Sequence, residues 1–376
     1  MDSSSRATDD VVVEAGLDEQ EEQRFSYAMQ LVSSAALPMV LLAAIRLDVL
    51  EVIAQAGPGA QLSPWDIAAQ ACPKNPDAAA MLDRMLQLLA SYSVLTCSVA
   101  EADASISSRR RVYGLAPVAK YFVQNKTYAA GGGGVSLGPL LALLQDKVFI
   151  DSWYQLEDAV REGGVPFDRV HGVHAFEYPA RDPRFNEVFN KAMINPTTIA
   201  INRIVERYKG FEHLKTLVDV GGGLGVTLGV ITAKYPSLKG INFDLPHVIQ
   251  HAPVYPGVEH VGGDMFESVP QGDAIFLRSI LHDWDDGRCL KLLKNCFKAL
   301  PKDGKVIVVD AIVPVVPDTS ASIKAICQSD VIMMAQIPGG KERSEAEFLD
   351  LATAAGFRGI RVECFVCDAW VMEFYK

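Results

Sequence analysis

The first third of the chain shows the hydrophobic spacing of amphipathic helices. From residue 25 to residue 123, apolar side chains recur every three or four positions, which is the period of a helix with one buried face. Within residues 78–95, one apolar stripe consists of Met81, Leu82, Met85, Leu88 and Leu89. Ser63 followed by Pro64 has the pattern of a helix start, with serine as the N-cap and proline in the first turn.

Two short β-type runs follow these helices. They cover residues 94–97 and 111–115 and indicate a small β-ribbon. Helices followed by a ribbon resemble a winged helix, a module that can bind DNA or mediate dimerisation. Three arginines at 109–111 favour DNA, but the preceding helix carries a single basic residue, Arg84. We therefore interpret residues 25–130 as a winged-helix-like dimerisation domain.

The second half of the chain has a different pattern. From residue 217 onward, short runs rich in valine and isoleucine alternate with helical stretches. The strand-like runs lie at 216–220, 240–243, 258–261, 274–277, 305–309 and 361–364. Such alternation is typical of an α/β fold with a doubly wound, mainly parallel sheet. We place this domain at residues 209–376 and a helical linker at 131–208, which begins with the glycine run at 131–134.

The composition and net charge of the chain limit the kinds of partner that it can bind. The chain has 376 residues, of which 49% are hydrophobic and 22% charged, the balance of a globular protein with a sizeable core. Its formal net charge is −11. Because nucleic acids and anionic membranes require a basic surface, we expect neither as a partner. Eight of the acidic residues lie within residues 1–24, which we interpret as a disordered acidic tail.

The number of cysteines and the length of the apolar runs indicate the cellular compartment of the protein. Seven cysteines, an odd number scattered over the chain, indicate reduced thiols in a cytoplasmic protein. Cys364 and Cys367 form a single C-x-x-C pair in a strand-like run, so we expect core packing rather than zinc binding. The longest apolar run, residues 31–45, is too short to span a membrane and predicts a buried helix. The acidic start lacks the pattern of a signal peptide, so we expect a soluble protein.

A glycine-rich turn follows the first strand of the predicted sheet. Residues 217–225 read LVDVGGGLG and lead into a helical run from Thr227. Glycines at the carboxyl end of a strand allow a tight turn and the close approach of a ligand. The dinucleotide fingerprint does not fit in register, because its last position is Val226, whereas D-x-G-x-G-x-G fits from Asp219.

Acidic residues follow at the ends of the next two strands. Asp244 ends the second strand, where a carboxylate can accept both ribose hydroxyls. Asp264 and Met265 follow the third strand, and they offer an acid to an adenine amine and a soft apolar face to its ring. No lysine or arginine lies near the glycine-rich turn to hold a phosphate. The pattern predicts a nucleoside cofactor without a pyrophosphate, and S-adenosylmethionine matches it.

Over residues 29–375 the chain resembles the plant small-molecule O-methyltransferases of the caffeic acid O-methyltransferase type. The motifs that carry the resemblance are LVDVGGGLG at 217–225, NFDLPH at 242–247, GGDMF at 262–266, ILHDW at 280–284 and GGKER at 339–343. The resemblance implies a class I methyltransferase Rossmann-like sheet, an N-terminal dimerisation domain, a homodimer, S-adenosylmethionine and no metal. It places the cofactor, beside Asp219, at Gly221, Asp244, Leu245, Asp264, Met265 and Arg278, the last in place of a more usual lysine.

Methylation of a phenol requires a base. A phenol has a pKa near 10, so forming the phenolate at pH 7.5 costs about 3.4 kcal/mol, and a positioned base contributes roughly 10²–10⁴-fold. Of seven histidines, His282 follows the strand at 274–277 on the cofactor side of the sheet and matches the base of the family. The resemblance implies that Asp310 and Glu342 flank His282 and that Asp283 helps to position the site. Asp310 replaces the glutamate of the relatives we know best.

The resemblance also implies an acceptor pocket. Phe185, Phe189 and Met193 share one helical stripe, and the remaining members of the pocket are Leu144, Ser279, Met333 and Ile337. Caffeic acid enzymes carry asparagine at the positions of Leu144 and Ile337 and tryptophan at that of Ser279. We therefore expect a less polar and roomier pocket, suited to a flavonoid, stilbene, coumarin, phenylpropanoid or alkaloid phenol.

Two other functions stay open on the sequence alone. An N-methyltransferase on an aromatic amine such as anthranilate shares the fold, although a neutral amine already offers a lone pair and needs His282 less. A non-enzymatic protein that binds DNA and senses a nucleoside is the second. Acidic residues at 283, 285 and 286 beside His282 resemble metal ligands, but acids at a helix start are typical N-caps, so we expect no metal.

Overall fold

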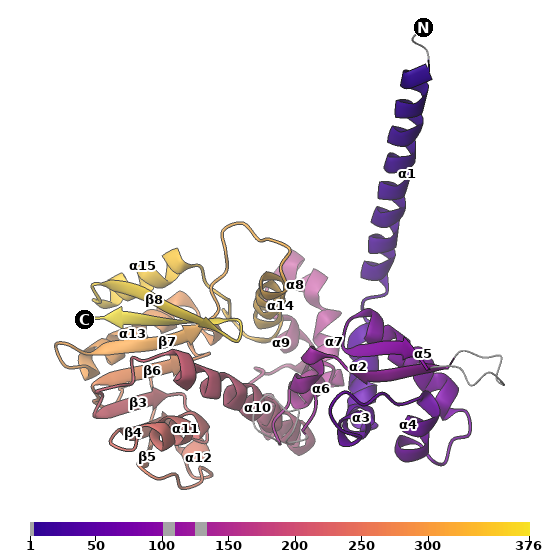
Figure 1. Cartoon of the computed structure of the whole chain (residues 1–376). Coiled ribbons are helices and arrows are strands. Elements are labelled where there is room, and N and C mark those ends of the chain that lie inside the picture. Colours follow the sequence, from indigo (N-terminus) through magenta and orange to yellow (C-terminus); the bar gives the residue numbers. More distant parts are fainter. Residues whose placement is uncertain (1–3, 101–109, 125–133) are drawn as a thin grey trace. The chain divides into compact units, whose positions relative to one another are not determined.

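The computed structural model describes residues 4–100, 110–124 and 134–376, with side chains from residue 18 onward. The chain divides into two compact units, Met1–Tyr128 and Ala129–Lys376 (Figure 1). The division falls close to the expected boundary after residue 130, and the segment 131–208, expected as a separate region, belongs to the same unit as the sheet. Arg109 and residues 131–133 of the glycine run lie outside the described residues.

The first unit consists of helices followed by a two-stranded ribbon. Its elements are α1 (Ser4–Val32), α2 (Ala36–Arg46), α3 (Val49–Gln55), α4 (Pro64–Ala71), α5 (Ala78–Ser91), β1 (Leu95–Val99), β2 (Arg111–Leu115) and the 3-10 helix η1 (Pro117–Tyr121). The Ser63 hydroxyl caps α4 by accepting from the Asp66 backbone N–H at 3.2 Å. The Asp66 carboxylate accepts in return from the Ser63 N–H at 3.1 Å, which confirms the predicted helix start as a capping box.

Two expectations about the N-terminal region are wrong. Residues 4–24 belong to α1 rather than to a disordered tail, because their glutamates, glutamines and alanines favour a helix despite the net charge. Residues 31–45 do not form one buried helix: α1 ends at Val32, α2 begins at Ala36, and Val32 is 81% exposed. The Ser33 hydroxyl donates to the Met29 carbonyl at 2.7 Å at this break, the local bonding by which serine competes with a continuing helix.

No single helix among the described residues is long and apolar enough to cross a membrane. Two successive helical segments, Asp18–Val32 and Ala36–Arg46, are long and apolar enough only when they are taken together, and their axes are bent by 54° at the break between them.

Helices precede the sheet in the second unit. They are α6 (Gly138–Leu144), α7 (Lys147–Trp153), α8 (Leu156–Glu162), α9 (Pro166–His171), the 3-10 helix η2 (Tyr178–Ala180) and α10 (Pro183–Arg207). An aromatic cluster of Phe149, Phe167, Tyr178 and Phe185 holds this region together, with ring centroids 5.4–6.0 Å apart. Helix α10 begins in this cluster and ends against the sheet, where Ile201 and Ile204 are buried.

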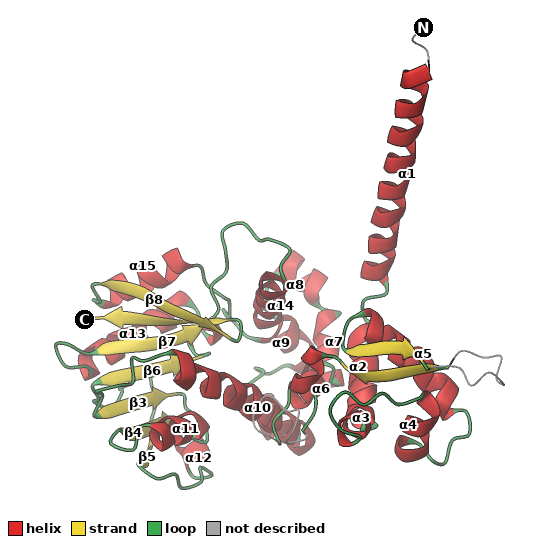
Figure 2. Cartoon of the chain, in the orientation of Figure 1, coloured by secondary structure: helices red, strands yellow, loops and turns green. Residues whose placement is uncertain are grey.

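Seven strands form the sheet of the second unit (Figure 2). In chain order they are β3 (Thr216–Val220), β4 (Lys239–Asp244), β5 (Val258–Gly262), β6 (Ala274–Arg278), β7 (Lys305–Asp310), β8 (Gly359–Val366) and β9 (Ala369–Tyr375). Their spatial order is β5-β4-β3-β6-β7-β9-β8, with β3 to β7 parallel and β9 antiparallel to both neighbours. This is the expected doubly wound α/β sheet, and its order reverses between β3 and β6, where ligands bind in such folds.

Helices cover both faces of the sheet because its strands are apolar on both sides. On one face, Leu277 and its neighbours pack against α13 (Asp286–Ala299) and α15 (Glu345–Ala355). On the other face, Phe276 packs with α10 and α11 (Val226–Lys234). The short elements α12 (Pro246–Ile249) and η3 (Leu281–Asp283), together with α14 (Ala321–Gln336), complete the unit.

The seven cysteines are all free thiols. Cys364 is partly buried in β8, but Cys367 is exposed in the turn between β8 and β9 at a φ of +51°. The expectation of core packing is therefore wrong for Cys367, because the chain reverses direction there into a strand that the sequence pattern did not predict.

Candidate active site

The glycine-rich turn joins β3 to α11, as the sequence predicts. Gly221 has a φ of +70°, and a Cβ there would lie 2.4 Å from Ile280 Cδ1, so only glycine fits. Its N–H donates to the Phe243 carbonyl at 2.8 Å. Gly223 has a φ of +57°, and a Cβ there would meet nothing within 4 Å. The turn thus presents bare backbone to open space at the carboxyl end of the sheet, which suits a closely bound ligand.

Asp219 lies beneath this turn, at 3% exposure. Burial, and after it the negative charge of Asp244, raise the pKa of its carboxyl to about 8, although Arg278 partly opposes both. Its Oδ2 is buried without a hydrogen-bond partner among the described residues. A buried carboxyl oxygen without a hydrogen-bond partner is a natural place for a ligand ammonium group.

Asp244 is tied directly to the glycine-rich turn. Its Oδ2 accepts from the Gly223 N–H at 2.8 Å, and its Oδ1 accepts from the Leu245 N–H at 2.7 Å. These bonds hold the carboxylate at the end of β4, beside the exposed side chain of Leu245. Asp264 makes a similar local bond, in which its Oδ1 accepts from the Phe266 N–H at 2.8 Å. The following Met265 packs against the core, and its carbonyl accepts from the Asn295 side chain at 3.0 Å.

Arg278 ends β6 at the point where the strand order reverses. Its Nη1 donates to the Thr197 hydroxyl of α10 at 3.0 Å. Burial lowers the pKa of the guanidinium, although the charges of Asp310 and Asp219 oppose this. Thr197 is a contact that the sequence did not reveal, because it lies 81 residues from Arg278 along the chain.

The structure places His282 in η3, immediately after β6. Its Nδ1 lies 3.0 Å from Glu342 Oε1, and its Nε2 lies 3.5 Å from Asp283 Oδ1. With Nδ1 bound to a carboxylate, Nδ1 carries the proton and Nε2 is the nitrogen available as a base. Glu342 is buried and oriented by two further bonds: the Ser329 hydroxyl donates to Oε1 at 2.8 Å, and the Glu342 N–H donates to Asp330 Oδ1 at 2.8 Å.

Acidic neighbours set the basicity of His282. Burial disfavours the imidazolium, but Asp283, Glu342 and Asp310 together outweigh it and raise the pKa of His282 to about 10. Burial raises the pKa of Asp283 to about 6 and that of Asp310 to about 7. The site therefore holds one positive charge among three carboxyls, and it binds a proton strongly.

Asp310 does not flank His282 by direct contact, contrary to what the resemblance implies. Both of its carboxyl oxygens are buried without a hydrogen-bond partner among the described residues, and it acts on His282 through charge. Aspartate is one methylene shorter than glutamate, which explains why a residue at the end of β7 falls short of the imidazole.

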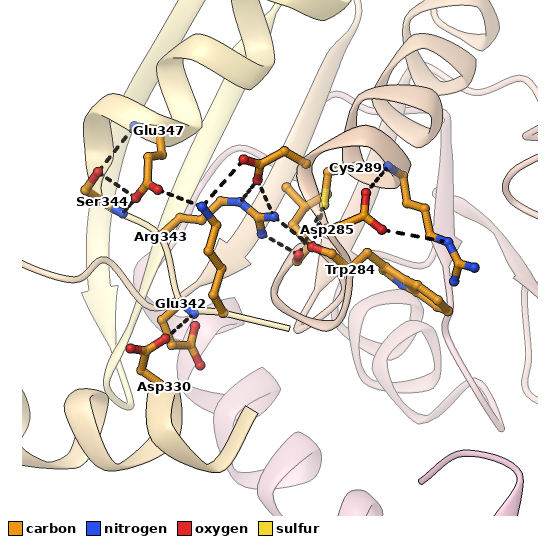
Figure 3. A network of polar contacts seen from close by, with 12 residues as sticks. Trp284, Asp285, Cys289, Asp330, Glu342, Arg343, Ser344 and Glu347 are labelled. Atoms are coloured by element: carbon orange, nitrogen blue, oxygen red, sulfur yellow. Dashed lines mark hydrogen bonds and ion pairs between the residues drawn. The ribbon is translucent and has the colours of Figure 1, made fainter. Parts of the chain in front are cut away.

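Arg343 binds the turn that carries His282; Figure 3 shows Arg343 within a network of polar contacts beside Trp284. Its guanidinium is fully buried and donates to the Leu281 carbonyl at 2.5 Å, the Trp284 carbonyl at 2.7 Å and Asp286 Oδ1 at 2.7 Å. The Lys341 N–H donates to the His282 carbonyl at 2.9 Å. The sequence singled out the GGKER motif at 339–343 but did not predict which groups Arg343 binds. Most of its acceptors are backbone carbonyls, which every residue carries and no sequence pattern marks.

Of the acids beside His282, which the sequence predicts to be helix caps, only Asp285 is one. Asp285 Oδ1 accepts from the Arg288 N–H at 3.0 Å and caps α13, while Asp286 pairs with Arg343 and Lys341. Within the parts of the chain that the structure describes, no three histidine, cysteine or acidic side chains are grouped as metal ligands.

The residues predicted to line the acceptor pocket differ in their exposure. Phe185 is completely buried in the aromatic cluster, so it supports the helix rather than offering a surface to an acceptor. Its neighbours on the α10 stripe, Phe189 and Met193, are partly exposed. Leu144 ends α6, Met333 lies in α14 with Ile337 just after it, and Ser279 has a φ of +52° at the exit of β6.

Phe176, which the sequence did not single out, and Trp284, the last residue of the ILHDW motif, connect this stripe to the His282 turn. The Phe176 ring lies 6.3 Å from Phe189 and 6.4 Å from Trp284, and Trp284 lies 5.0 Å from Phe266, measured between centroids. Phe176 is 42% exposed. This row of rings ends two residues from His282, and its exposed members offer apolar ring edges and faces near that turn.

Comparison with known proteins decides the family. Residues 153–358 match the O-methyltransferase domain family, and residues 29–125 match the O-methyltransferase dimerisation domain. The chain belongs to the O-methyltransferase family. It is 63% identical over 369 residues to cathecol O-methyltransferase 1 of Solanum lycopersicum, covering 95% of this chain and 96% of that protein. It is 56% identical over 357 residues to caffeic acid 3-O-methyltransferase of Medicago sativa, covering 95% of each chain.

Solved structures of other methyltransferases have the same fold as this O-methyltransferase. The methyltransferase CalO1, in its SAH-bound form, has a TM-score of 0.74 at 26% identity and covers 93% of this chain and 98% of its own. Human N-acetylserotonin methyltransferase, in complex with SAM, has a TM-score of 0.75 at 22% identity and covers 94% and 98%. The chain is an S-adenosylmethionine-dependent O-methyltransferase with an N-terminal dimerisation domain, and the comparisons give no support to the N-methyltransferase alternative.

Proposed function

We propose that this O-methyltransferase methylates a phenolic hydroxyl group of a plant-type aromatic metabolite, with His282 as the general base. The observation that carries the proposal is the bond between His282 Nδ1 and Glu342 Oε1 at 3.0 Å, beside the row of rings Phe189, Phe176 and Trp284. A flat acceptor resting on these rings brings its hydroxyl to the turn that holds the base. The names of the tomato and alfalfa relatives, which specify catechol and caffeic acid, support a phenol.

The residues around the glycine-rich turn fit S-adenosylmethionine. The unpaired Asp219 oxygen suits the ammonium group of the cofactor, the bare backbone at Gly221 and Gly223 allows close approach, and Asp244 suits its ribose. We assign the cofactor to Asp219, Gly221, Asp244, Leu245, Asp264, Met265 and Arg278. When bound, S-adenosylmethionine supplies an electrophilic methyl group.

His282 makes the acceptor oxygen nucleophilic by taking its proton at Nε2. The raised pKa of His282, about 10, equals that of an ordinary phenol. Proton transfer from phenol to a neutral His282 imidazole is therefore close to balanced within the site, and the fraction of neutral imidazole grows as the pH rises toward 10. Glu342 holds the tautomer and stabilises the imidazolium that forms. Asp283 and Asp310 add to this stabilisation through their charges.

The lining of the acceptor site favours an apolar ring system. Leu144 and Ile337 offer no hydrogen-bond donor, and Ser279 is small. We infer that the preferred acceptor is bulkier or less polar than caffeic acid: a flavonoid, stilbene, coumarin, phenylpropanoid or alkaloid phenol. Phe189, Met193 and Met333 form the proposed contacts, and the buried Phe185 and Ile337 pack behind them.

We further propose a homodimer in the cytoplasm, with no nucleic acid or membrane partner. Large apolar side chains of the first unit are exposed, among them Phe25, Tyr27, Met29, Met39 and Met81. Their exposure supports burial against a second copy. Seven free thiols support a reducing compartment. Sedimentation tests the dimer: the proposal expects twice the chain mass of 40.8 kDa, and a monomer alone would contradict it.

A transfer assay with labelled S-adenosylmethionine tests the function. The panel pairs each phenol with the amine that replaces its hydroxyl, and it includes caffeic acid and anthranilate, with and without EDTA. We expect label on phenols only, unaffected by EDTA, and more on apolar polycyclic phenols than on caffeic acid. Label on the amines, or loss of activity with EDTA, would contradict the proposal.

A further inference from the structure

Three polar side chains lie side by side beneath the glycine-rich turn. The strand pairing sets Asp219 of β3 opposite Asn242 of β4, and Asn242 opposite His260 of β5. Neighbours in a parallel sheet point to the same face, so the three form a row across the strands. Asn242 is completely buried, unlike most asparagines. The row runs from β3 to the edge strand β5, and burying its polar groups is costly unless they are hydrogen-bonded, which directs attention to their partners.

Asn242 holds the turn through its amide nitrogen. Nδ2 donates to the Gly223 carbonyl at 2.9 Å and contacts His260 Nδ1 at 3.1 Å. An amide nitrogen carries two hydrogens, so each of these contacts receives one. Gly222 packs so closely over the same amide that a Cβ there would lie 2.1 Å from Asn242 Oδ1. The side chain of Asn242 thus packs against the glycine-rich turn and is hydrogen-bonded to it.

His260 decides which way the Asn242 amide faces. His260 Nε2 lies 2.9 Å from the Pro253 carbonyl, which only accepts hydrogen bonds, so Nε2 carries the proton. The unprotonated Nδ1 must then accept, and it accepts from Asn242 Nδ2. A flipped amide would set Oδ1 against both the His260 lone pair and the Gly223 carbonyl. One tautomer of His260 therefore selects the amide orientation that binds the turn.

Gly225 provides the space for this arrangement. A Cβ at Gly225 would lie 2.9 Å from His260 Cε1 and 3.3 Å from Asn242 Nδ2. The last glycine of the motif is thus required by the imidazole packed against it, in addition to its φ of +81° at the start of α11.

We propose that His260 is a positioning residue for the cofactor: acting as a hydrogen-bond acceptor at Nδ1, it orients Asn242, which fixes the Gly221–Gly225 backbone for S-adenosylmethionine. The proposal deepens the cofactor site and rests on that cofactor, not on a phenolic acceptor. The His260 ring nitrogens contact Asn242 and the Pro253 carbonyl, so loss of the imidazole acts on the cofactor through the turn and leaves the acceptor surface and the base untouched.

Two amide substitutions separate the two bonds of His260. In His260→Asn the side-chain amide reaches the place of Nδ1 and keeps the acceptor for Asn242. In His260→Gln the amide reaches the place of Nε2 and keeps the donor for Pro253 only. His213→Asn is the matched control, since His213 is an exposed histidine of the same unit. Binding of S-adenosylhomocysteine by calorimetry needs no acceptor, so it stays informative if the phenol assignment fails.

We expect His260→Asn and His213→Asn to bind S-adenosylhomocysteine within about twofold of wild type, and His260→Gln to bind about tenfold more weakly. The KM for S-adenosylmethionine follows the same order, with the acceptor KM and the saturated kcat unchanged. Equal affinity of the Asn and Gln variants would overturn the proposal, whether both match wild type or both are weak. His260→Leu, isosteric with the Asn variant, provides a second comparison: it too must bind weakly, and wild-type affinity in it would equally overturn the proposal.

Discussion

The imidazole of His282 donates from Nδ1 to Oε1 of Glu342 over 3.0 Å, and the same oxygen accepts from the Ser329 hydroxyl at 2.8 Å. The carboxylate is buried, so its charge acts on the imidazole with little screening. This pair sets both the tautomer and the proton affinity of the base.

Replacing Glu342 by glutamine tests the origin of this proton affinity. Glu342 favours the imidazolium, so neutralising it lowers the pKa of His282, and the rising limb of the kcat/KM profile against pH moves to lower pH by about one unit. In wild type that limb lies above the ordinary histidine value of about 6.5. The pH profile of methyl transfer provides the measurement, and a limb that stays in place or moves upward would contradict the assignment.

Asp219 predicts a proton release on cofactor binding. Its pKa of about 8 leaves it mostly neutral at pH 7, and the ammonium group of a bound cofactor lowers that pKa, so the carboxyl ionises. We expect roughly one proton to be released per S-adenosylhomocysteine bound at pH 7. Calorimetry in buffers of different ionisation enthalpy measures this release. Asp219→Asn is the control and should lose it; equal release by both proteins would exclude Asp219 as the source.

Arg343 predicts a loss of both stability and rate. Arg343→Lys keeps the charge but cannot serve the carbonyls of Leu281 and Trp284 together with Asp286. Buried acceptors are left unpaired, so we expect the free energy of unfolding to fall by about 2–4 kcal/mol and kcat to drop because the His282 turn loosens. Chemical denaturation and steady-state kinetics measure the two effects. Wild-type stability with wild-type kcat would show that the turn is held by other contacts.

Two phenylalanines one helical turn apart should behave differently. Phe185 is fully buried in the aromatic cluster, so Phe185→Ala should cost about 3–5 kcal/mol of stability. Phe189 is partly exposed beside Phe176, so Phe189→Ala should mainly raise the acceptor KM. Thermal unfolding and acceptor kinetics compare the pair. The reverse result would place the acceptor on the other side of α10.

Much of the fold is readable from the sequence because its signals are local. The strands β3 to β7 appear as valine- and isoleucine-rich runs, and each lies within a residue or two of its predicted bounds. Strand β9 was missed: it inserts antiparallel between β7 and β8, and its partners are set by a tight turn at Cys367 and Asp368 rather than by its own pattern.

In the functional site, too, the sequence predicts what a local pattern marks and does not predict contacts between distant segments. Residues within a motif, such as Asp244 and His282, were found, because a strand end or a family pattern marks each of them. Contacts between distant segments were not. Thr197 with Arg278, Ser329 with Glu342 and His260 with Asn242 depend on sheet register and helix placement, which no local pattern encodes. Asn242 did carry one signal, an amide between the apolar residues Ile241 and Phe243 of β4.

The central claim, that His282 removes a proton from a phenol, is tested most directly by comparing wild type with His282→Ala on a series of phenols of falling pKa. A base matters most when the acceptor holds its proton most firmly. We expect the substitution to cost about 10²–10⁴-fold in kcat for a phenol with a pKa near 10, and far less for one that is ionised at the assay pH. The same loss for every phenol in the series would contradict a general-base role for His282.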